Sequence, residues 1–285
     1  GHNSSDATKP ALPVYDQAGL AIISSTSTSS DLTSLDKKNN VFFRTAPSNQ
    51  ALARTLAQHV TTQAGLDKVV IFYNSESAYS QNLKDSFKTQ FKHLGGRVVW
   101  EIKLNNPDLK ITEELEISLS QDQVKAAMLF PSEKDIETAV NIAKANANLN
   151  PNNPNPPRLK LFGGDSLYNP KILQQGGEAV EGLTMALPWF KGSQDARNFS
   201  TAANKLWKGD VSWRTATSFD ATQAFIQALF QDADREIVLN RLRNINLVPS
   251  DTSGLDLQFT HQGEHQNSEP FLVKVDNGKF ELVSE

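Results

Sequence analysis

Two hydroxyl-rich segments lie close together near the start of the chain. Residues 1–8 read GHNSSDAT and precede a predicted helix, and residues 24–31 read SSTSTSSD and follow a short apolar stretch. A helix N-terminus exposes unpaired N–H groups and the positive end of the helix dipole, so hydroxyls beside it can complete a site for an anion such as a carboxylate. Serine and threonine clusters also serve as ordinary caps and turns. The segments therefore allow an anion site without requiring one.

Apolar stretches of strand length alternate with helical patterns along the chain, as in a parallel sheet covered by helices. The Asn- and Pro-rich residues 150–157 predict a surface loop, and residues 271–283 predict a hairpin with an Asn-Gly turn. The predicted strands are residues 20–23, 41–44, 68–73, 98–102, 126–130, 159–162 and 183–188. The predicted helices are residues 6–18, 48–63, 80–94, 133–147, 196–207, 217–232 and 235–243.

Composition excludes several classes of function. With 285 residues the chain is long enough for two lobes with separate cores. The net charge is −4 and basic residues are scattered among acidic ones, so we expect no nucleic-acid partner. No apolar run reaches the roughly 18 residues that membrane insertion requires. The chain has no cysteine, which excludes disulfides, thiolate nucleophiles and Cys–zinc sites. This suits a secreted protein, although cytosolic proteins also can lack cysteine.

Catalytic and metal-binding patterns are weak. His2, Ser5 and Asp6 lie within one helical turn and lack the base and orienting group that make a serine nucleophilic. His261 and His265 have i, i+4 spacing, but in a polar loop they are more typical of surface histidines than of a zinc site. We therefore expect no catalysis, no metal and no cofactor, and keep an amidase or hydrolase as the alternative from another class.

The order of the motifs resembles that of type I periplasmic binding proteins, the substrate-binding components of branched-chain amino acid and amide ABC transporters. The shared pattern is Gly-His-x-Ser-Ser-x-x-Thr, a tyrosine at Tyr15, a Gly-Leu-x-x-Ile-Ser strand and a Thr-Ser-Thr loop. In that family two strand–helix units and a strand, about 75 to 100 residues, precede the Gly-His turn, so the resemblance implies that this chain lacks them. Further matches lie at residues 43–45, 68–73, 79, 162–165, 181–182, 218–221 and 271–283.

The resemblance implies a two-lobed α/β fold, in which each lobe is a mostly parallel sheet flanked by helices and a hinge of several crossovers joins the lobes. The crossovers are expected near Pro47, Pro188 and Thr260. The first lobe would then contain residues 1–47 and 189–259, and the second would contain residues 48–188 and 260–285. Such hinged lobes close on a ligand.

The resemblance also implies the ligand contacts. In the first lobe the hydroxyls of Ser5 and Thr28 and the backbone N–H of Thr26 would bind the α-carboxylate of an amino acid. In the second lobe Asp165 would pair with the ammonium group, at a position where many family members carry Glu. Each residue has an alternative reading as a cap, and for Asp165 this is the N-cap of the following turn.

Aromatic and amide side chains complete the implied pocket. The residues are Tyr79, Phe130 and Asn49, which match second-lobe positions, and Trp189 and Phe219, which are expected near the hinge. Aromatic rings at such places are also common in cores.

The function implied is capture of a small neutral L-amino acid, followed by delivery to an ABC permease. The protein would be a monomer located in the periplasm or at the cell surface. A ligand-sensing ectodomain with the same fold is the alternative within the class of binding proteins.

Overall fold

The computed structural model describes residues 1–33, 40–120, 124–149 and 158–283. The chain divides into two compact units, each built from separate stretches of sequence. Unit 1 contains Gly1–Asn49 and Pro188–Phe271, and unit 2 contains Gln50–Leu187 and Leu272–Glu285. The predicted loop at residues 150–157 lies outside the described residues.

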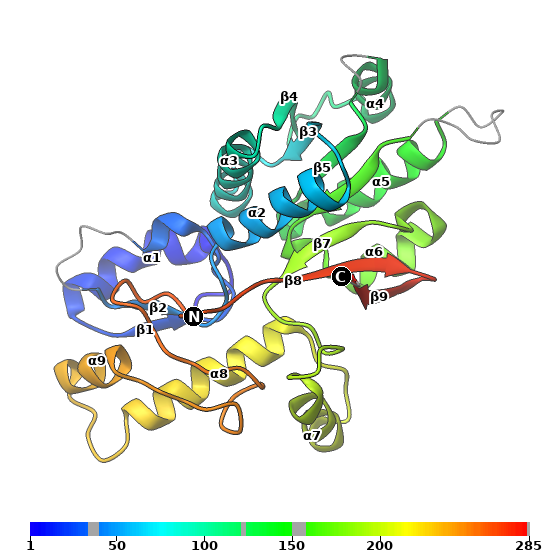
Figure 1. Cartoon of the computed structure of the whole chain (residues 1–285). Helices are drawn as coiled ribbons and strands as arrows, with labels where there is room; N and C mark the ends of the chain where they lie inside the picture. The colour runs from blue at the N-terminus through cyan, green and yellow to red at the C-terminus, as the bar shows by residue number, and fades with distance from the viewer. Residues whose placement is uncertain (34–39, 121–123, 150–157, 284–285) are drawn as a thin grey trace. The chain divides into compact units, whose positions relative to one another are not determined.

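Unit 1 begins with α1 (Ser5–Ala18), which Ser4 caps at its N-terminus by accepting from the Ala7 N–H. Strands β1 (Ile22–Ser24) and β2 (Phe42–Arg44) pair in parallel, with Ile22 opposite Phe42. The later part of the chain adds α7 (Arg197–Trp207), α8 (Trp213–Ala228) and α9 (Arg235–Arg243). These helices and strands are labelled in Figure 1. Apolar side chains of α1, both strands, α8 and α9 form one core cluster, so the sheet and the late helices stabilise each other.

Unit 2 contains a seven-stranded sheet with the order β4-β3-β5-β6-β7-β8-β9. The pairs from β4 through β7 are parallel, and β8 and β9 form an antiparallel hairpin. At its turn Asn277 and Gly278 both have positive φ, which confirms the predicted Asn-Gly hairpin. The strands are β3 (Lys68–Tyr73), β4 (Arg97–Lys103), β5 (Ala126–Phe130), β6 (Lys160–Gly163), β7 (Thr184–Leu187), β8 (Phe271–Asp276) and β9 (Lys279–Leu282).

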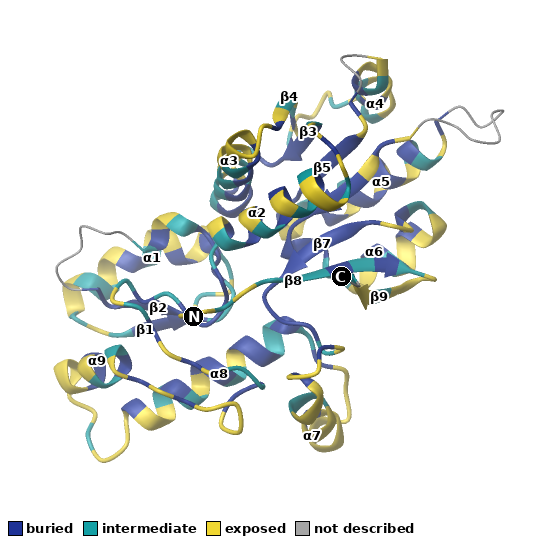
Figure 2. Cartoon of the chain, in the orientation of Figure 1, coloured by how far each residue is buried: buried dark blue, intermediate teal, exposed yellow. Residues whose placement is uncertain are grey.

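Helices lie along the sheet of unit 2 and cover its central strands. They are α2 (Asn49–Gln58), α3 (Ala78–His93), α4 (Ile111–Ser120), α5 (Ile136–Ala147) and α6 (Pro170–Gly176). Every residue of β5 is buried, as expected for a parallel strand covered on both faces. Figure 2 shows that the central strands are buried, whereas the helices expose one side to solvent.

The mixed α/β architecture confirms the predicted fold class, but several boundaries differ. Two short helices, α4 and α6, were not among the predicted elements, and α8 begins four residues earlier than the pattern predicts. Residues 260–271 cluster with unit 1 instead of the predicted second lobe. The physical reason is a set of backbone bonds to the end of β2, including one from the Arg44 N–H to the Gly263 carbonyl oxygen at 2.9 Å.

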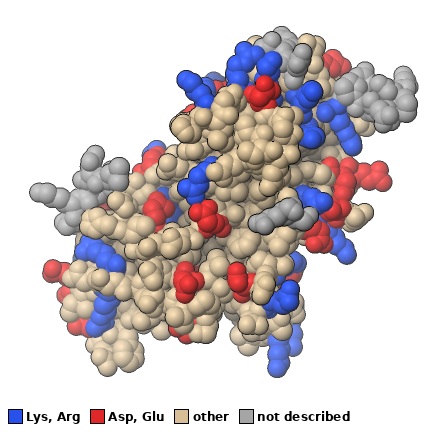
Figure 3. Space-filling view, in the orientation of Figure 1, with Lys and Arg blue, Asp and Glu red and all other residues tan. Residues whose placement is uncertain are grey.

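Both signs of charge are present on the face shown in Figure 3. Several Lys and Arg side chains gather near the top of the view, and elsewhere they lie among Asp and Glu side chains. In the described part of the chain, no helix is both long enough and apolar enough to cross a bilayer.

Candidate functional site

The first polar cluster lies in unit 1, in residues 24–29, here called the hydroxyl loop, which begins at the last residue of β1. Two bonds fasten this loop to the first turn of α1. The Thr8 and Ser27 hydroxyls lie 2.7 Å apart, and the Ser29 N–H donates to Ser5 Oγ at 3.0 Å. The structure therefore brings together the two hydroxyl-rich segments that the sequence singled out.

Ser5 and Thr28 both retain capacity for a ligand. Ser5 Oγ accepts from Ser29, so the hydroxyl proton of Ser5 can still be donated. Thr28 is fully buried, and its Oγ1 has no hydrogen-bond partner among the described residues. A buried hydroxyl without a partner is costly unless something else satisfies it. Thr28 is thus the strongest indication of a ligand in unit 1.

Thr26 is used differently. Its hydroxyl donates to the Asn3 carbonyl oxygen at 3.0 Å and so points back toward the start of the chain. Its backbone N–H lies 3.4 Å from Ser24 Oγ, a long hydrogen bond that a carboxylate could replace. The predicted role of this N–H stays a prediction.

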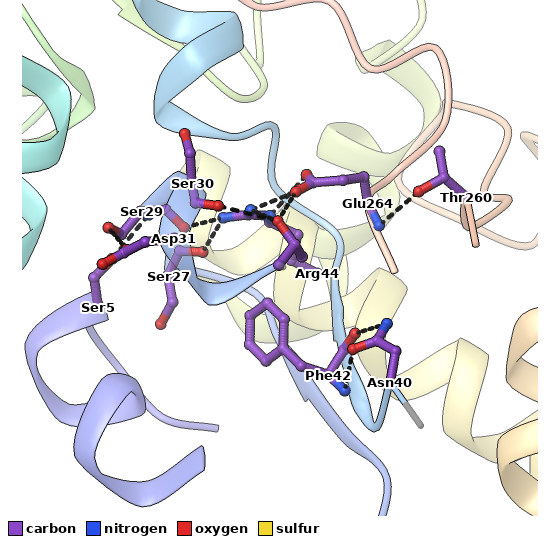
Figure 4. Close-up of polar contacts among 11 residues, drawn as sticks. Ser5, Ser27, Ser29, Ser30, Asp31, Asn40, Phe42, Arg44, Thr260 and Glu264 are labelled. Atoms are coloured by element: carbon purple, nitrogen blue, oxygen red, sulfur yellow. Dashed lines mark hydrogen bonds and ion pairs between the residues drawn. The ribbon is translucent and has the colours of Figure 1, made fainter. Parts of the chain in front are cut away.

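Arg44, at the end of β2, lies behind the hydroxyl loop and is fully buried. One of its nitrogens, Nη1, donates to the carbonyl oxygens of Ser27 and Ser29 at 3.1 and 2.8 Å. The guanidinium also forms a bidentate ion pair with Glu264 (Figure 4). The sequence offered one signal for this pair, because an arginine at the end of an otherwise apolar strand requires an acidic partner.

The second polar cluster lies in unit 2, where Asp165 follows β6. Asp165 is 3% exposed, and its Oδ1 accepts from the Tyr79 hydroxyl at 2.8 Å. A β-carbon on Gly164 would lie only 2.6 Å from that hydroxyl, so glycine allows the close approach. Burial and the negative charge of Asp165 hold the pKa of Tyr79 well above its usual value, so the phenol remains a donor.

The N-cap positions that follow β6 are taken by other residues. The short 3-10 helix Asp165–Leu167 has Gly164 at its N-cap, and α6 is capped by Asn169, which accepts from the Lys171 N–H at 3.0 Å. Burying an ionised aspartate is expensive, so buried carboxylates are candidates for functional sites.

The other predicted residues fall mostly in cores. The Phe130 ring lies in the core cluster of unit 2, with its centroid 5.7 Å from that of Phe87. In unit 1, the rings of Trp189 and Phe219 both contact Phe199, with centroid distances of 5.9 and 5.0 Å. Their predicted roles as pocket walls stay predictions.

Asn49 also lies close to the hydroxyl loop, although the resemblance assigned it to the second lobe. It clusters with unit 1, and its N–H donates to the Thr28 carbonyl oxygen at 2.5 Å. This bond helps to fix the backbone of Thr28. A ligand contact from the Asn49 side chain stays a prediction.

Sequence reasoning missed a second buried carboxylate, Asp220 in α8. Its Oδ1 accepts from the Ser253 N–H at 2.6 Å and its Oδ2 from the Ser253 hydroxyl at 2.7 Å. Burial raises the pKa of Asp220 to about 6, although the bonds from Ser253 and the nearby His265 lower it. Both oxygens are held by one neighbouring residue, which is typical of a structural role. The described residues contain no group of His, Asp and Glu side chains that could hold a metal ion.

Comparison with solved structures shows the same fold in substrate-binding proteins. A substrate-binding protein of an ABC transporter from Desulfitobacterium hafniense, solved with Leu, is 22% identical, with a TM-score of 0.79 over 99% of this chain and 79% of that chain. The leucine-binding protein LivK from Thermotoga maritima is 19% identical, with a TM-score of 0.82 over 100% of this chain and 78% of that chain. LivJ from Streptococcus pneumoniae, solved with isoleucine, is 18% identical, with a TM-score of 0.81 over 100% and 78%.

Comparison at the level of sequence families gives a match over nearly the whole chain. The family described as periplasmic binding protein matches residues 1–279, whereas no curated protein sequence matches. The family consists of binding proteins, so the prediction that the chain is not an enzyme is confirmed at this level. The chain belongs to the periplasmic binding protein family.

Proposed function

We propose that this protein binds a small neutral L-α-amino acid and delivers it to an ABC permease. The carboxylate of the ligand would bind at the hydroxyl loop and its ammonium group at Asp165. The observation that carries the proposal is the opposite polarity of the two clusters. Unit 1 has, beside a helix N-terminus, a buried Thr28 hydroxyl with no partner among the described residues, and unit 2 has a buried carboxylate. A zwitterion has one group that suits each cluster.

The family and its structural relatives support the biological setting. Membership in the periplasmic binding protein family implies an extracytoplasmic location. Relatives with this fold were solved with Leu and with isoleucine. Transfer to a permease and a monomeric state are parts of the proposal that follow from this setting.

The proposed pocket residues predict which side chains the ligand can carry. Tyr79, Phe130, Trp189 and Phe219 supply apolar area and no charge. We therefore expect neutral ligands, aliphatic and small polar alike, to bind. Charged amino acids would be rejected, because burying an unpaired charge costs several kcal/mol. Discrimination among neutral ligands should be modest, since one methylene is worth only about 1–3 kcal/mol.

A thermal-shift screen of the twenty amino acids tests the proposal. Ligand that binds only the folded state raises stability by RT ln(1 + [L]/Kd), so binders raise the melting temperature in a concentration-dependent way. We expect stabilisation by alanine, valine, leucine or isoleucine and none by arginine or glutamate. Titration calorimetry of each hit, followed by competition with arginine and glutamate, supplies the control. Absence of any neutral binder would overturn the proposal, and displacement by a charged amino acid would overturn its specificity.

A further inference from the structure

Arg44 uses its whole hydrogen-bonding capacity inside unit 1. Its five contacts are Nε to Glu264, Nη1 to the Ser27 and Ser29 carbonyl oxygens, and Nη2 to Thr33 Oγ1 and Glu264. A guanidinium has five N–H donors, so no donor remains for a ligand. Arg44 is therefore unsuited to direct contact with a carboxylate, in spite of its charge and its place behind the hydroxyl loop.

The two carbonyl groups that Arg44 holds lie on either side of Thr28 in the chain. Ser27 and Ser29 are bound through the same nitrogen, at 3.1 and 2.8 Å. The backbone of Thr28 cannot rotate without breaking one of these bonds or the bond from the Asn49 N–H to the Thr28 carbonyl oxygen. Arg44 thus holds the backbone on both sides of Thr28, from which the buried hydroxyl projects.

Glu264 holds Arg44 in turn, and its own place is fixed by the turn at residues 260–265. The Glu264 N–H donates to Thr260 Oγ1 at 3.1 Å, and the Gly263 N–H donates to the Thr260 carbonyl oxygen at 2.8 Å (Figure 4). Gly263 has a φ of +84°, and a β-carbon there would lie 2.0 Å from the Phe42 carbonyl oxygen. Only glycine permits this turn to pack against β2.

We propose that Arg44 and Glu264 are positioning residues, which hold the hydroxyl loop so that Thr28 and Ser5 can bind a carboxylate. This inference rests on the proposed function. It extends the site to a pair of residues 220 positions apart that do not touch the ligand. The charge of Glu264 matters because it neutralises a guanidinium that is otherwise fully buried.

The test is Glu264→Gln, which keeps the shape of the side chain and removes its charge. The probes are the tightest binder among L-alanine, L-valine, L-leucine and L-isoleucine, and the amide of that amino acid. The amide keeps the ammonium group and lacks the carboxylate. We expect the acid to bind at least tenfold more weakly to the variant and the amide to change less than twofold, so that the preference for the acid collapses.

The matched control is Glu101→Gln in unit 2. Glu101 has the same side-chain exposure as Glu264, 26%, and pairs with Lys84 and Lys88. This control should leave the affinities for acid and amide unchanged. Thr33→Val is a milder second variant, because the Thr33 hydroxyl bridges Arg44 and Glu264. It should lower the preference for the acid by a smaller factor, and it serves if Glu264→Gln does not fold.

The outcomes separate the inference from the proposed function. A parent protein that binds none of the four amino acids, or binds acid and amide equally, contradicts the proposed function itself. The positioning role alone is overturned if the parent prefers the acid and the variants keep this preference. It is also overturned if the variants lose affinity for acid and amide in equal measure.

Discussion

Unit 1 and unit 2 each place polar side chains just after the strands of a parallel sheet, where ligands of α/β proteins commonly bind. The two clusters differ in polarity. In unit 1 the hydroxyl loop and the start of α1 offer hydrogen-bond donors, and the positive charge of Arg44 is neutralised by Glu264. In unit 2 Asp165 offers a negative charge that Tyr79 orients. The carboxylate of a ligand is attracted to a helix N-terminus and can accept hydrogen bonds from neutral donors. The ammonium group of a ligand requires a negatively charged partner, such as a protein carboxylate, when it is buried.

The buried carboxylates of the two units sharpen this contrast. Asp165 and Asp220 are 3% and 4% exposed. Ser253 donates to both oxygens of Asp220, and the Tyr79 hydroxyl donates to Asp165. We propose that Asp165 binds the ligand and that Asp220 supports the fold, and variants of the two residues can separate these roles.

The largest expected effect is that of Asp165→Ala on ligand affinity. Removing one partner of a buried charge pair typically costs about 3–5 kcal/mol, a loss of some hundreds to thousands in affinity. Titration calorimetry with the best neutral amino acid measures this loss, with circular dichroism to show that the fold is kept. Asp220→Asn is the control of equal burial and should bind normally. An affinity of Asp165→Ala within threefold of the parent would remove Asp165 from the site.

Asp220→Asn should instead change how stability depends on pH. The folded state raises the Asp220 pKa from 3.8 to about 6, so it binds this proton more tightly than the unfolded chain does. The resulting stabilisation is complete below pH 3.8 and is lost as the pH rises through about 6, a change of about 3 kcal/mol. Urea unfolding of parent and variant between pH 4 and pH 7 measures it. Parallel stability curves would show that Asp220 does not titrate in this window.

Ser5→Ala should weaken binding of the acid by about 1.5–3 kcal/mol, the usual value of a hydrogen bond to a charged group. The variant also leaves the buried Ser29 N–H without its acceptor, so the free energy of unfolding should fall by about 1–3 kcal/mol. Calorimetry with acid and amide separates the two effects, because only the first depends on the ligand carboxylate. Equal losses for acid and amide would contradict the predicted contact.

The smallest effect on ligand affinity is expected for Thr26→Val, and Thr28→Val is the variant to compare with it. The Thr26 hydroxyl bonds to Asn3, so its removal should cost about 1 kcal/mol of folding stability and little affinity. The Thr28 hydroxyl has no such partner among the described residues, so its removal should cost affinity and little stability. Thermal unfolding and calorimetry on the pair check this. The reverse order of affinities would show that the wrong threonine was assigned.

The sequence predicted much of the fold because its signals are local. Buried strands such as Lys68–Tyr73 are apolar runs, and the Asn-Gly turn of the hairpin requires positive φ. Helix α4 was missed because its ten residues, ITEELEISLS, show no clear apolar stripe. The position of such a helix depends on its tertiary contacts, which the periodicity of the sequence does not indicate.

The candidate site could be predicted only in part. The hydroxyl segments are neighbours along the chain, and the structure brings them together as expected. The pairs that orient the site join residues far apart, Tyr79 with Asp165 and Arg44 with Glu264. Such pairs depend on the order of the strands and on a return of the chain near residue 264. No local pattern in the sequence determines them.

The most direct measurement of the central claim pairs changes in the protein with changes in the ligand. Leucine, leucinamide and 4-methylpentanoate, which lacks the ammonium group, would each be titrated into the parent, Ser5→Ala and Asp165→Ala. We predict that Ser5→Ala loses affinity only for ligands with the carboxylate and that Asp165→Ala loses affinity only for ligands with the ammonium group. The coupling energy of each matched pair should exceed about 1 kcal/mol. Losses that do not depend on which ligand group is present would contradict the assignment of opposite ends of the ligand to the two clusters.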